Sequence, residues 1–301
     1  MPKSAAYLSP LIVRPLCEPH KTTFIVLHGR GSNAEKFSGP LLSHPVTVSS
    51  SASLDNQPQP FQKLFPHTKF IFPTASLRRA TAFNRSIIHQ WYDILPSPSS
   101  IAQALPPSHP DRVERDGLRE SVLHLHSLIE HEVEELDGDA GRLVVMGLSQ
   151  GCATMLAGCM NWNGPKLGAV VGMCGWLPMR EGMADAIALH ELQDQEADMF
   201  DRGSDGGIKK TKVDIAVEYM CDELGIERRE EQNNSGWKDT PVFLGHGTDD
   251  EKVLCRLGQE AAEFLRGIDV DAIFRSYEGL GHWYSSNMLC DIMEFIKSRA
   301  E

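Results

Sequence analysis

The chain has 301 residues, of which 41% are hydrophobic, and its formal net charge at pH 7 is −12. This composition can build a sizeable core, as one large domain or two small ones. The acidic balance argues against nucleic acid as a partner and against adhesion to anionic membranes by charge alone, because both need concentrated lysine and arginine.

The cysteines and the apolar runs indicate in which cellular compartment the protein is expected. Seven cysteines occur with no Cys-x-x-Cys pair, and several of them, such as Cys152 and Cys174, have apolar neighbours. This favours reduced, buried thiols over a disulfide framework. No apolar run reaches the length of a membrane span, and the first residues lack the apolar core of a signal peptide. We therefore expect a soluble, cytoplasmic protein with no integral membrane segment.

Taken in chain order, short apolar runs alternate with helical patterns. The runs mostly do not alternate in polarity, which is typical of strands buried on both faces of a parallel sheet. They are Thr23–Leu27, Lys69–Phe72, Leu143–Met146, Leu167–Met173, Val242–Leu244 and Ala272–Ser276. Apolar residues at helical spacing fill Asp111–Leu136, Gly151–Met160, Lys252–Leu265 and Asn287–Lys297. The alternation predicts a doubly wound α/β sheet.

Two segments interrupt this alternation. Ser43–Pro60 is rich in Ser, Pro and Gln and is expected to be an exposed loop. Glu181–Lys238 is strongly charged around a few apolar positions, which predicts a small helical cap inserted into the sheet. Its charged centre, Asp201–Gly207, is expected to be mobile.

The pentapeptide Gly147-Leu148-Ser149-Gln150-Gly151 lies between a predicted strand and a predicted helix. A sharp strand-to-helix turn exposes a serine as a nucleophile, and the flanking glycines leave room for that turn. The string alone is weak evidence, because a chain with 25 glycines would carry it by chance roughly one time in six. Its place between strand and helix makes Ser149 a candidate nucleophile.

A serine nucleophile needs a general base and a carboxylate that orients this base, in the order Ser, Asp, His for such a fold. His282 follows the last predicted strand in a glycine-containing turn. Asp249 and Asp250 both follow the strand at Val242, and spacing does not choose between them. Asp249 has the alternative role of capping the next helix.

An oxyanion hole would complete this machinery with preorganised amide donors. The loop Leu27-His28-Gly29-Arg30-Gly31 ends the first strong strand, and the backbone amides of Arg30 and Gln150 are the candidate donors. His28 is expected to be structural. No phosphate-loop, zinc or dinucleotide pattern occurs, so we expect no cofactor and no metal.

These segments together resemble the acyl-protein thioesterase and carboxylesterase family of α/β-hydrolases, also called the phospholipase/carboxylesterase group. The resemblance covers roughly 22 to 180 and 240 to 298 and includes Gln90-Trp91-Tyr92-Asp93-Ile94, Gly147–Gly151 and Cys174-Gly175-Trp176-Leu177-Pro178. It implies an α/β-hydrolase domain over 1–301 with a cap-like insertion at 181–238. In the family pattern His-Gly-x-x-Asp the triad aspartate falls on Asp250. The triad histidine falls on His282, and the oxyanion donors fall on Arg30 and Gln150.

The chain also departs from the family pattern. Arg30-Gly31-Ser32 stands where animal thioesterases have Leu-Gly-Asp, so a cation replaces an apolar wall residue. The segment 78–88 occupies the place of the acyl-binding loop. A substrate pocket is expected to include Ile87, Ile88, Trp91 and Trp176, although such residues also serve as ordinary core.

The expected function is a serine hydrolase that forms an acyl-enzyme, with an acyl thioester or carboxylic ester as substrate, including an S-acylated protein. One alternative is a carboxylesterase for small metabolites or a lysophospholipase. Another is a non-catalytic binding protein with the same fold. The sequence does not determine the acyl chain, the leaving group or the oligomeric state.

Overall fold

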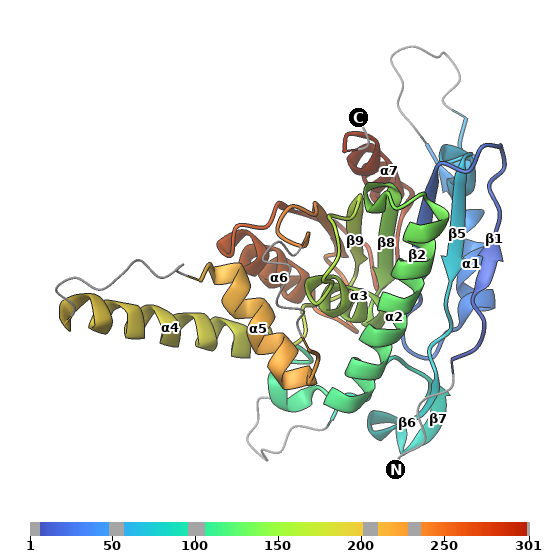
Figure 1. The fold of residues 1–301 in the computed structure, drawn as a ribbon. Coiled ribbons are helices and arrows are strands. Elements are labelled where there is room, and N and C mark those ends of the chain that lie inside the picture. The colour runs from blue at the N-terminus through green and yellow to red at the C-terminus, as the bar shows by residue number, and fades with distance from the viewer. Residues whose placement is uncertain (1–6, 48–56, 96–105, 201–209, 228–235, 300–301) are drawn as a thin grey trace.

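The computed structural model describes residues 7–47, 57–95, 106–200, 210–227 and 236–299. Its centre is a seven-stranded sheet in the order β1-β5-β2-β8-β9-β10-β11 (Figure 1). All neighbouring strands are parallel except β1, which runs antiparallel to β5. The strands are β1 (Leu11–Val13), β2 (Thr22–Leu27), β5 (Thr68–Phe72), β8 (Leu143–Leu148), β9 (Ala169–Met173), β10 (Val242–Gly247) and β11 (Ala272–Tyr277).

The described helices flank this sheet. They are α1 (Ala34–Leu42), α2 (Arg115–Glu135), α3 (Gln150–Met160), α4 (Arg180–Phe200), α5 (Lys212–Leu224), α6 (Cys255–Gly267) and α7 (Ser286–Lys297). Two small antiparallel pairs complete the fold: β3 (Pro45–Val46) with β4 (Gln59–Pro60), and β6 (Leu77–Ala80) with β7 (Ser86–His89). Short 3-10 turns occupy Phe61–Leu64, Thr81–Phe83, Pro110–Arg112 and Ala140–Arg142.

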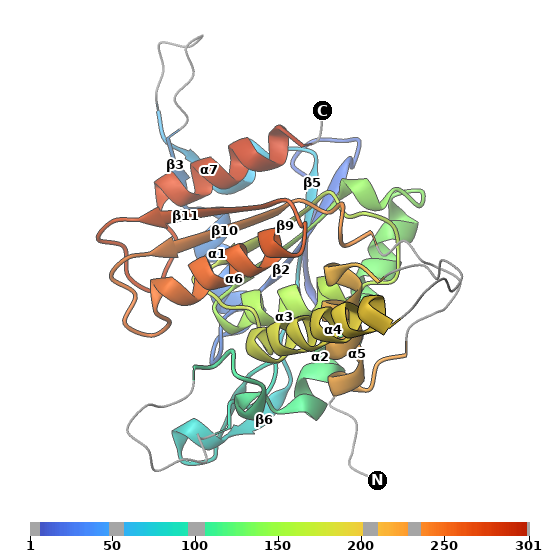
Figure 2. The ribbon, with the colours of Figure 1, turned by 90° about the vertical axis from the view of Figure 1, so that its left-hand side faces the viewer.

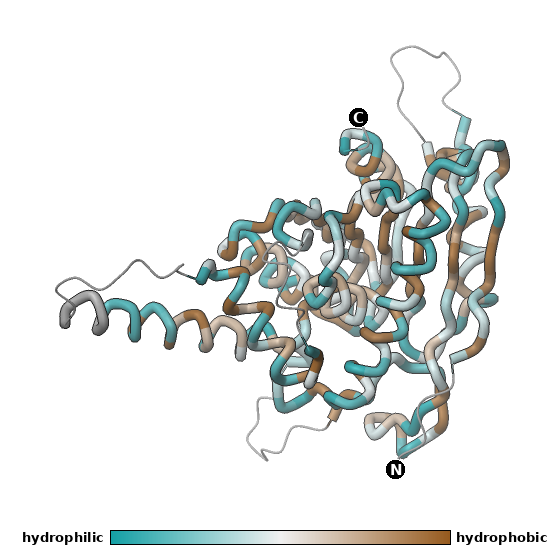
Figure 3. The backbone as a smooth tube through the Cα atoms, viewed as in Figure 1, coloured by the Kyte–Doolittle hydropathy of each residue, from teal (hydrophilic) through white to brown (hydrophobic). Residues whose placement is uncertain are grey.

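The sheet has a hydrophobic core on each face, because successive side chains of a strand point to opposite sides. Ile25 and Leu27 of β2 belong to the core that α2, α3, α5 and α6 cover. Phe24 and Val26 belong to the core under α1 and α7. Figure 2 shows this arrangement, and Figure 3 shows the hydrophobic runs of β1 and β5. The predicted doubly wound, mostly parallel sheet is confirmed.

All six strands predicted from the sequence are present, as are the four predicted helices with small changes at their ends. The helix predicted from Asp111 begins at Arg115, because a 3-10 turn precedes it and the Glu114 side chain accepts a hydrogen bond from the Gly117 amide. The expected loop Ser43–Pro60 carries β3 and β4 at its ends, and its residues 48–56 lie outside the described residues.

The inserted segment 181–238 contains most of α4 and all of α5. Helix α5 begins at a capping box between Thr211 and Asp214 and ends at Gly225, which adopts a left-handed conformation. It buries Val213, Ala216 and Met220 in the core beside α2. Helix α4 packs on α5 and extends away from the body (Figure 1). The charged centre 201–207, expected to be mobile, lies outside the described residues.

Candidate active site

Ser149 lies at the turn between β8 and α3, with φ 58° and ψ −121°. A non-glycine residue at such a positive φ is strained, and the strain lifts the side chain out of the turn. A Cβ atom on Gly147 would lie 2.5 Å from the carbonyl carbon and oxygen of Gly151, and one on Gly151 would lie 2.5 Å from the Leu27 oxygen. Both glycines are therefore required by close backbone contacts.

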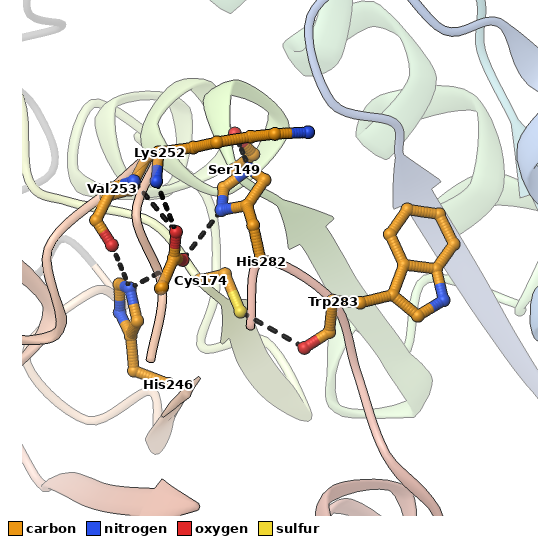
Figure 4. Close-up of polar contacts among 8 residues, drawn as sticks. Ser149, Cys174, His246, Lys252, Val253, His282 and Trp283 are labelled. Atoms are coloured by element: carbon orange, nitrogen blue, oxygen red, sulfur yellow. Dashed lines mark hydrogen bonds and ion pairs between the residues drawn. The ribbon is translucent and has the colours of Figure 1, made fainter. Parts of the chain in front are cut away.

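Three side chains from different parts of the chain meet at this turn (Figure 4). His282 Nε2 lies 2.8 Å from Ser149 Oγ, and His282 Nδ1 lies 2.6 Å from Asp250 Oδ2. His282 lies in the loop after β11, and Asp250 lies in the loop after β10. Since these strands are parallel neighbours, their carboxyl ends bring the three groups to one edge of the sheet.

Asp250 is buried, and four donors contact its carboxylate. Besides His282, these are the backbone amides of Lys252 and Val253, each 2.9 Å from Oδ1, and His246 Nε2, 3.1 Å from Oδ2. His246 Nε2 also lies 2.8 Å from the Val253 oxygen, so this nitrogen carries the proton and donates to both acceptors. Burial lowers the pKa of His246, which keeps its ring neutral.

Asp249 lies outside this arrangement. Its side chain is exposed and accepts a hydrogen bond from Thr248 Oγ1 at 2.9 Å. The alternative that spacing left open therefore has a geometric answer: Asp250, and not Asp249, contacts His282. His246 was not among the site residues predicted from the sequence, although the His-Gly-x-x-Asp pattern contains it.

The loop after β2 lies against the serine turn, since a Cβ atom on Gly29 would lie 3.3 Å from the Ser149 Cβ, and the Arg30 amide follows Gly29 in this loop. In the described part of the chain no acceptor is found for this amide, and the Gln150 amide begins helix α3, where the first N–H groups have no acceptor within the helix. Both residues line the cavity beside Ser149. The two amides therefore stay the candidate donors of an oxyanion hole.

Several buried side chains fix this loop. Trp91 Nε1 donates to the His28 oxygen at 2.8 Å, and the Gln150 side chain bonds the backbone of Trp91 and Tyr92. His28 Nδ1 donates to the Gly29 oxygen at 2.7 Å, while Nε2 accepts from the Ala75 amide. Burial lowers the pKa of His28 to about 4, so it stays neutral and structural, as expected.

The cavity beside Ser149 has a volume of about 570 Å³. Its lining is mostly apolar, with glycines and a few polar groups, and comprises Gly29, Arg30, Gly31, Ser32, Phe37, Phe83, Ile88, Ile94, Pro107, Leu148, Ser149, Gln150, Trp176, Lys252, Val253, His282 and Trp283. Of the expected pocket residues, Ile88 and Trp176 are in this lining. Ile87 and Trp91 are not.

The expectation for Ile87 and Trp91 needs correction on physical grounds. Ile87 is 59% exposed on β7, because Ile88 is the residue of that strand that faces inward to the cavity. Trp91 is 1% exposed and belongs to the core, where its indole N–H anchors the loop at His28. Phe83, which lies in the segment 78–88 expected to replace the acyl-binding loop, also lines the cavity. Phe37, Lys252 and Trp283 line it as well and were not found from the sequence, since they come from segments far apart in the chain.

The described part of the inserted segment lies outside the lining of this cavity. Among its described residues, none lines the cavity, although Glu181 at the base of α4 accepts a hydrogen bond from Ser108, next to the lining residue Pro107. The described helices α4 and α5 pack against each other and against α2 and α6. These described helices do not line the cavity, and the cap-like insertion at 181–238 stays a prediction.

Cys174, His246 and Asp250 are the only group among the described residues whose ligand atoms lie close enough together to hold a metal ion. These atoms are already engaged. The Asp250 carboxylate and His246 Nε2 bind the donors and acceptors described above, and Cys174 Sγ donates to the Trp283 oxygen at 3.3 Å. The group is thus part of the hydrogen-bond network around His282.

A family model described as phospholipase/carboxylesterase matches residues 10–193 and 224–300. The chain belongs to this family. Membership makes it a hydrolase, and the internal unmatched stretch, 194–223, falls within the inserted segment. The family comprises α/β-hydrolases, in agreement with the sheet and its flanking helices.

Individual relatives agree with the family assignment. The chain is 26% identical to "Carboxylesterase SOBER1" of Arabidopsis thaliana, over 92% of this chain and 90% of the relative. It is also 26% identical to "Acyl-protein thioesterase 1" of Yarrowia lipolytica, over 96% of each.

Solved structures show the same fold. "Zea mays acyl-protein thioesterase 2" superposes with a TM-score of 0.62 at 20% identity, covering 97% of this chain and 99% of that one. "Arabidopsis thaliana SOBER1" gives 0.61 at 22% identity, covering 93% and 100%. In the described parts of this chain, none of the helices is both long enough and apolar enough to cross a bilayer.

Proposed function

We propose that the chain is a serine hydrolase that cleaves carboxylic esters or acyl thioesters through an acyl-enzyme. The observation that carries this proposal is the continuous chain of contacts from Ser149 Oγ to His282 Nε2 at 2.8 Å and from His282 Nδ1 to Asp250 Oδ2 at 2.6 Å. The names of the relatives, carboxylesterase and acyl-protein thioesterase, support the two substrate classes.

In the acylation step, Ser149 Oγ attacks the substrate carbonyl carbon while His282 Nε2 takes its proton. Asp250 accepts the Nδ1–H of His282, which fixes the tautomer that leaves Nε2 free to act as the base. The tetrahedral oxyanion accepts hydrogen bonds from the amides of Arg30 and Gln150. His282 then returns the proton to the leaving oxygen or sulfur, and a water molecule hydrolyses the acyl-enzyme by the same route.

The size of the cavity favours a small or medium substrate. About 570 Å³ lies in the ordinary range of roughly 300–1,000 Å³ for pockets that bind small molecules. Ile88 and Trp176 supply apolar wall to an acyl group. An S-acylated protein remains the second candidate, and it would place only its acyl chain and thioester in this cavity.

A fluorophosphonate probe tests the proposal directly, because it phosphonylates only an activated serine. We expect the unaltered chain to be labelled and Ser149→Ala to lose the label and about 10⁶ of the turnover of 4-nitrophenyl esters. Circular dichroism on both proteins controls for folding. Labelling that persists in Ser149→Ala would refute the nucleophile, and a chain that is never labelled and never turns over an ester would favour the non-catalytic binding protein.

We also propose a reducing, cytoplasmic location. All seven cysteines are free, and Cys152, Cys159, Cys174 and Cys221 are buried. Burial raises the pKa of the Cys174 thiol to about 12, so this thiol resists oxidation. Fluorescence microscopy of the tagged chain, with mass spectrometry of alkylated thiols, tests this location.

A further inference from the structure

We propose that the cavity beside Ser149 takes an ester or thioester that carries a second, negatively charged group, a carboxylate or a phosphate, and that Arg30 and Lys252 bind this group. The inference rests on the proposed function, since it concerns the substrate of the same site.

The charge of the cavity differs from that of the whole chain. The chain has 41 acidic and 29 basic residues, not counting histidine. Among the described residues that line the cavity, none is acidic, whereas Arg30 and Lys252 carry positive charge. A concave site with charge of one sign concentrates ligands of the opposite sign. The cavity is therefore a cationic site in an acidic protein.

Arg30 presents hydrogen-bond donors that the described residues leave unused. Its guanidinium carbon lies 4.8 Å from the centre of the Phe83 ring, which holds the group by a cation–π contact. The side chain is half-buried, and within the described residues its guanidinium has no hydrogen bond or ion pair. Burial lowers the pKa of Arg30, so the charged form lacks full solvation.

Asp93 is the carboxylate whose charge acts on Arg30, but no hydrogen bond or ion pair joins the two described side chains. Asp93 raises the pKa of Arg30 and so acts on it through space, but its oxygens accept hydrogen bonds from the backbone and side chain of Thr81. A guanidinium has five N–H donors in a planar fork that matches a carboxylate or a phosphate. An anionic ligand would supply the acceptors that the fold does not.

Lys252 brings a second cation to the same cavity from a different loop. Its backbone amide donates to Asp250 Oδ1 at 2.9 Å, so the position of the residue is tied to the carboxylate that orients His282. Its exposed side chain extends past Ser149 (Figure 4) and lines the cavity. A strongly hydrated ammonium at the mouth suits attraction of an anion, and the half-buried guanidinium suits its binding.

Three chromogenic esters with the same acyl length test the inference and locate the charge. They are the neutral 4-nitrophenyl hexanoate, mono-4-nitrophenyl adipate with a carboxylate on the acyl group, and 4-nitro-3-hexanoyloxybenzoate with a carboxylate on the leaving group. We expect kcat/KM for at least one anionic ester, corrected for its spontaneous hydrolysis, to exceed that of the neutral ester by about tenfold or more.

The ratio of anionic to neutral kcat/KM is the decisive quantity, since it is independent of any general loss of turnover. Arg30→Gln should lower this ratio about tenfold and Lys252→Gln less, because Lys252 is exposed. Arg79→Gln is the matched control, because Arg79 is exposed on the neighbouring β6 and outside the cavity lining. If Arg30→Gln fails to fold, the ratio for the unaltered chain should still decline as NaCl rises from about 0.05 to about 1 M.

The outcomes separate this inference from the proposed function. Equal kcat/KM for neutral and anionic esters, or a ratio that Arg30→Gln lowers no more than Arg79→Gln does, would overturn the inference and leave the hydrolase intact. Absence of hydrolysis for all three esters, together with absence of fluorophosphonate labelling, would overturn both.

Discussion

His246 donates a hydrogen bond to Asp250: its Nε2 lies 3.1 Å from the Oδ2 atom that also accepts from His282. Both side chains are buried, with 1% of His246 and 3% of Asp250 exposed. The backbone amides of Lys252 and Val253 also donate to this carboxylate, so all four of its neighbours are hydrogen-bond donors. The surroundings of Asp250 thus offer donors only, which suits a side chain with two accepting oxygens.

Asp250→Asn should lower turnover about 10⁴-fold, because an amide cannot hold His282 in the required tautomer and its NH₂ group would face the surrounding donors. The matched control is Asp249→Asn, which alters an exposed side chain bonded to Thr248 and should have only a mild effect. Steady-state kinetics on a 4-nitrophenyl ester measures both. Equal losses, or the larger loss in Asp249→Asn, would refute the role of Asp250.

Trp91→Phe should lower kcat with little change in KM, because it removes the donor that anchors the His28 oxygen and so loosens the loop of the Arg30 amide. The loss should be about tenfold, smaller than the roughly 10²–10³ that follows removal of an oxyanion donor itself. Trp162→Phe is the control: it removes a similar bond to the Pro165 oxygen at 3.0 Å, away from the cavity. Equal kcat values for the two variants would contradict a positioning role for Trp91.

Acid should destabilise the protein partly through His124, which stacks on Tyr7 with 3.9 Å between ring centres. Burial lowers its pKa to about 4, below the usual 6.5. The unfolded chain therefore binds a proton that the folded chain resists, and the stabilisation present above about pH 6.5 is lost as the pH falls towards about 4.

His124→Phe keeps the stacked ring and removes this titration. Between about pH 7.5 and about pH 4.5, its unfolding free energy should rise relative to that of the unaltered chain by about 1–2 kcal/mol. Urea unfolding at the two pH values measures the difference. A constant difference would mean that His124 has the same pKa in both states.

Met220→Ala should lower the unfolding free energy by about 2–5 kcal/mol, because Met220 of α5 is fully buried in the core beside α2. Leu189→Ala, at a position 58% exposed on α4, should change it by less than about 0.5 kcal/mol.

If the insert serves stability and not access, neither variant should change the dependence of kcat/KM on acyl length, measured with 4-nitrophenyl esters from acetate to palmitate. A changed profile would favour a cap that limits access.

Some elements escaped prediction because their sequences lack the usual pattern. Gly39 and Pro40 lie near the end of α1, and because both residue types disfavour helices, the sequence did not predict this helix. The hairpin of β6 and β7 carries Arg78, Arg79 and an exposed Ile87, so it does not resemble a buried strand. Helix α5 was anticipated only as part of a charged insert, and its packing against α2 was not.

The sequence by itself determined the sheet, the serine turn and the loops that hold the candidate base and carboxylate. These features are local: an apolar run reports burial on both faces, and glycines at 147 and 151 report a turn that excludes a side chain. The tertiary structure alone decided that Trp91 anchors a loop from the core and that Arg30 and Lys252 share one cavity. Those relations depend on side chains that are distant in the chain and brought together by packing, so no local pattern encodes them.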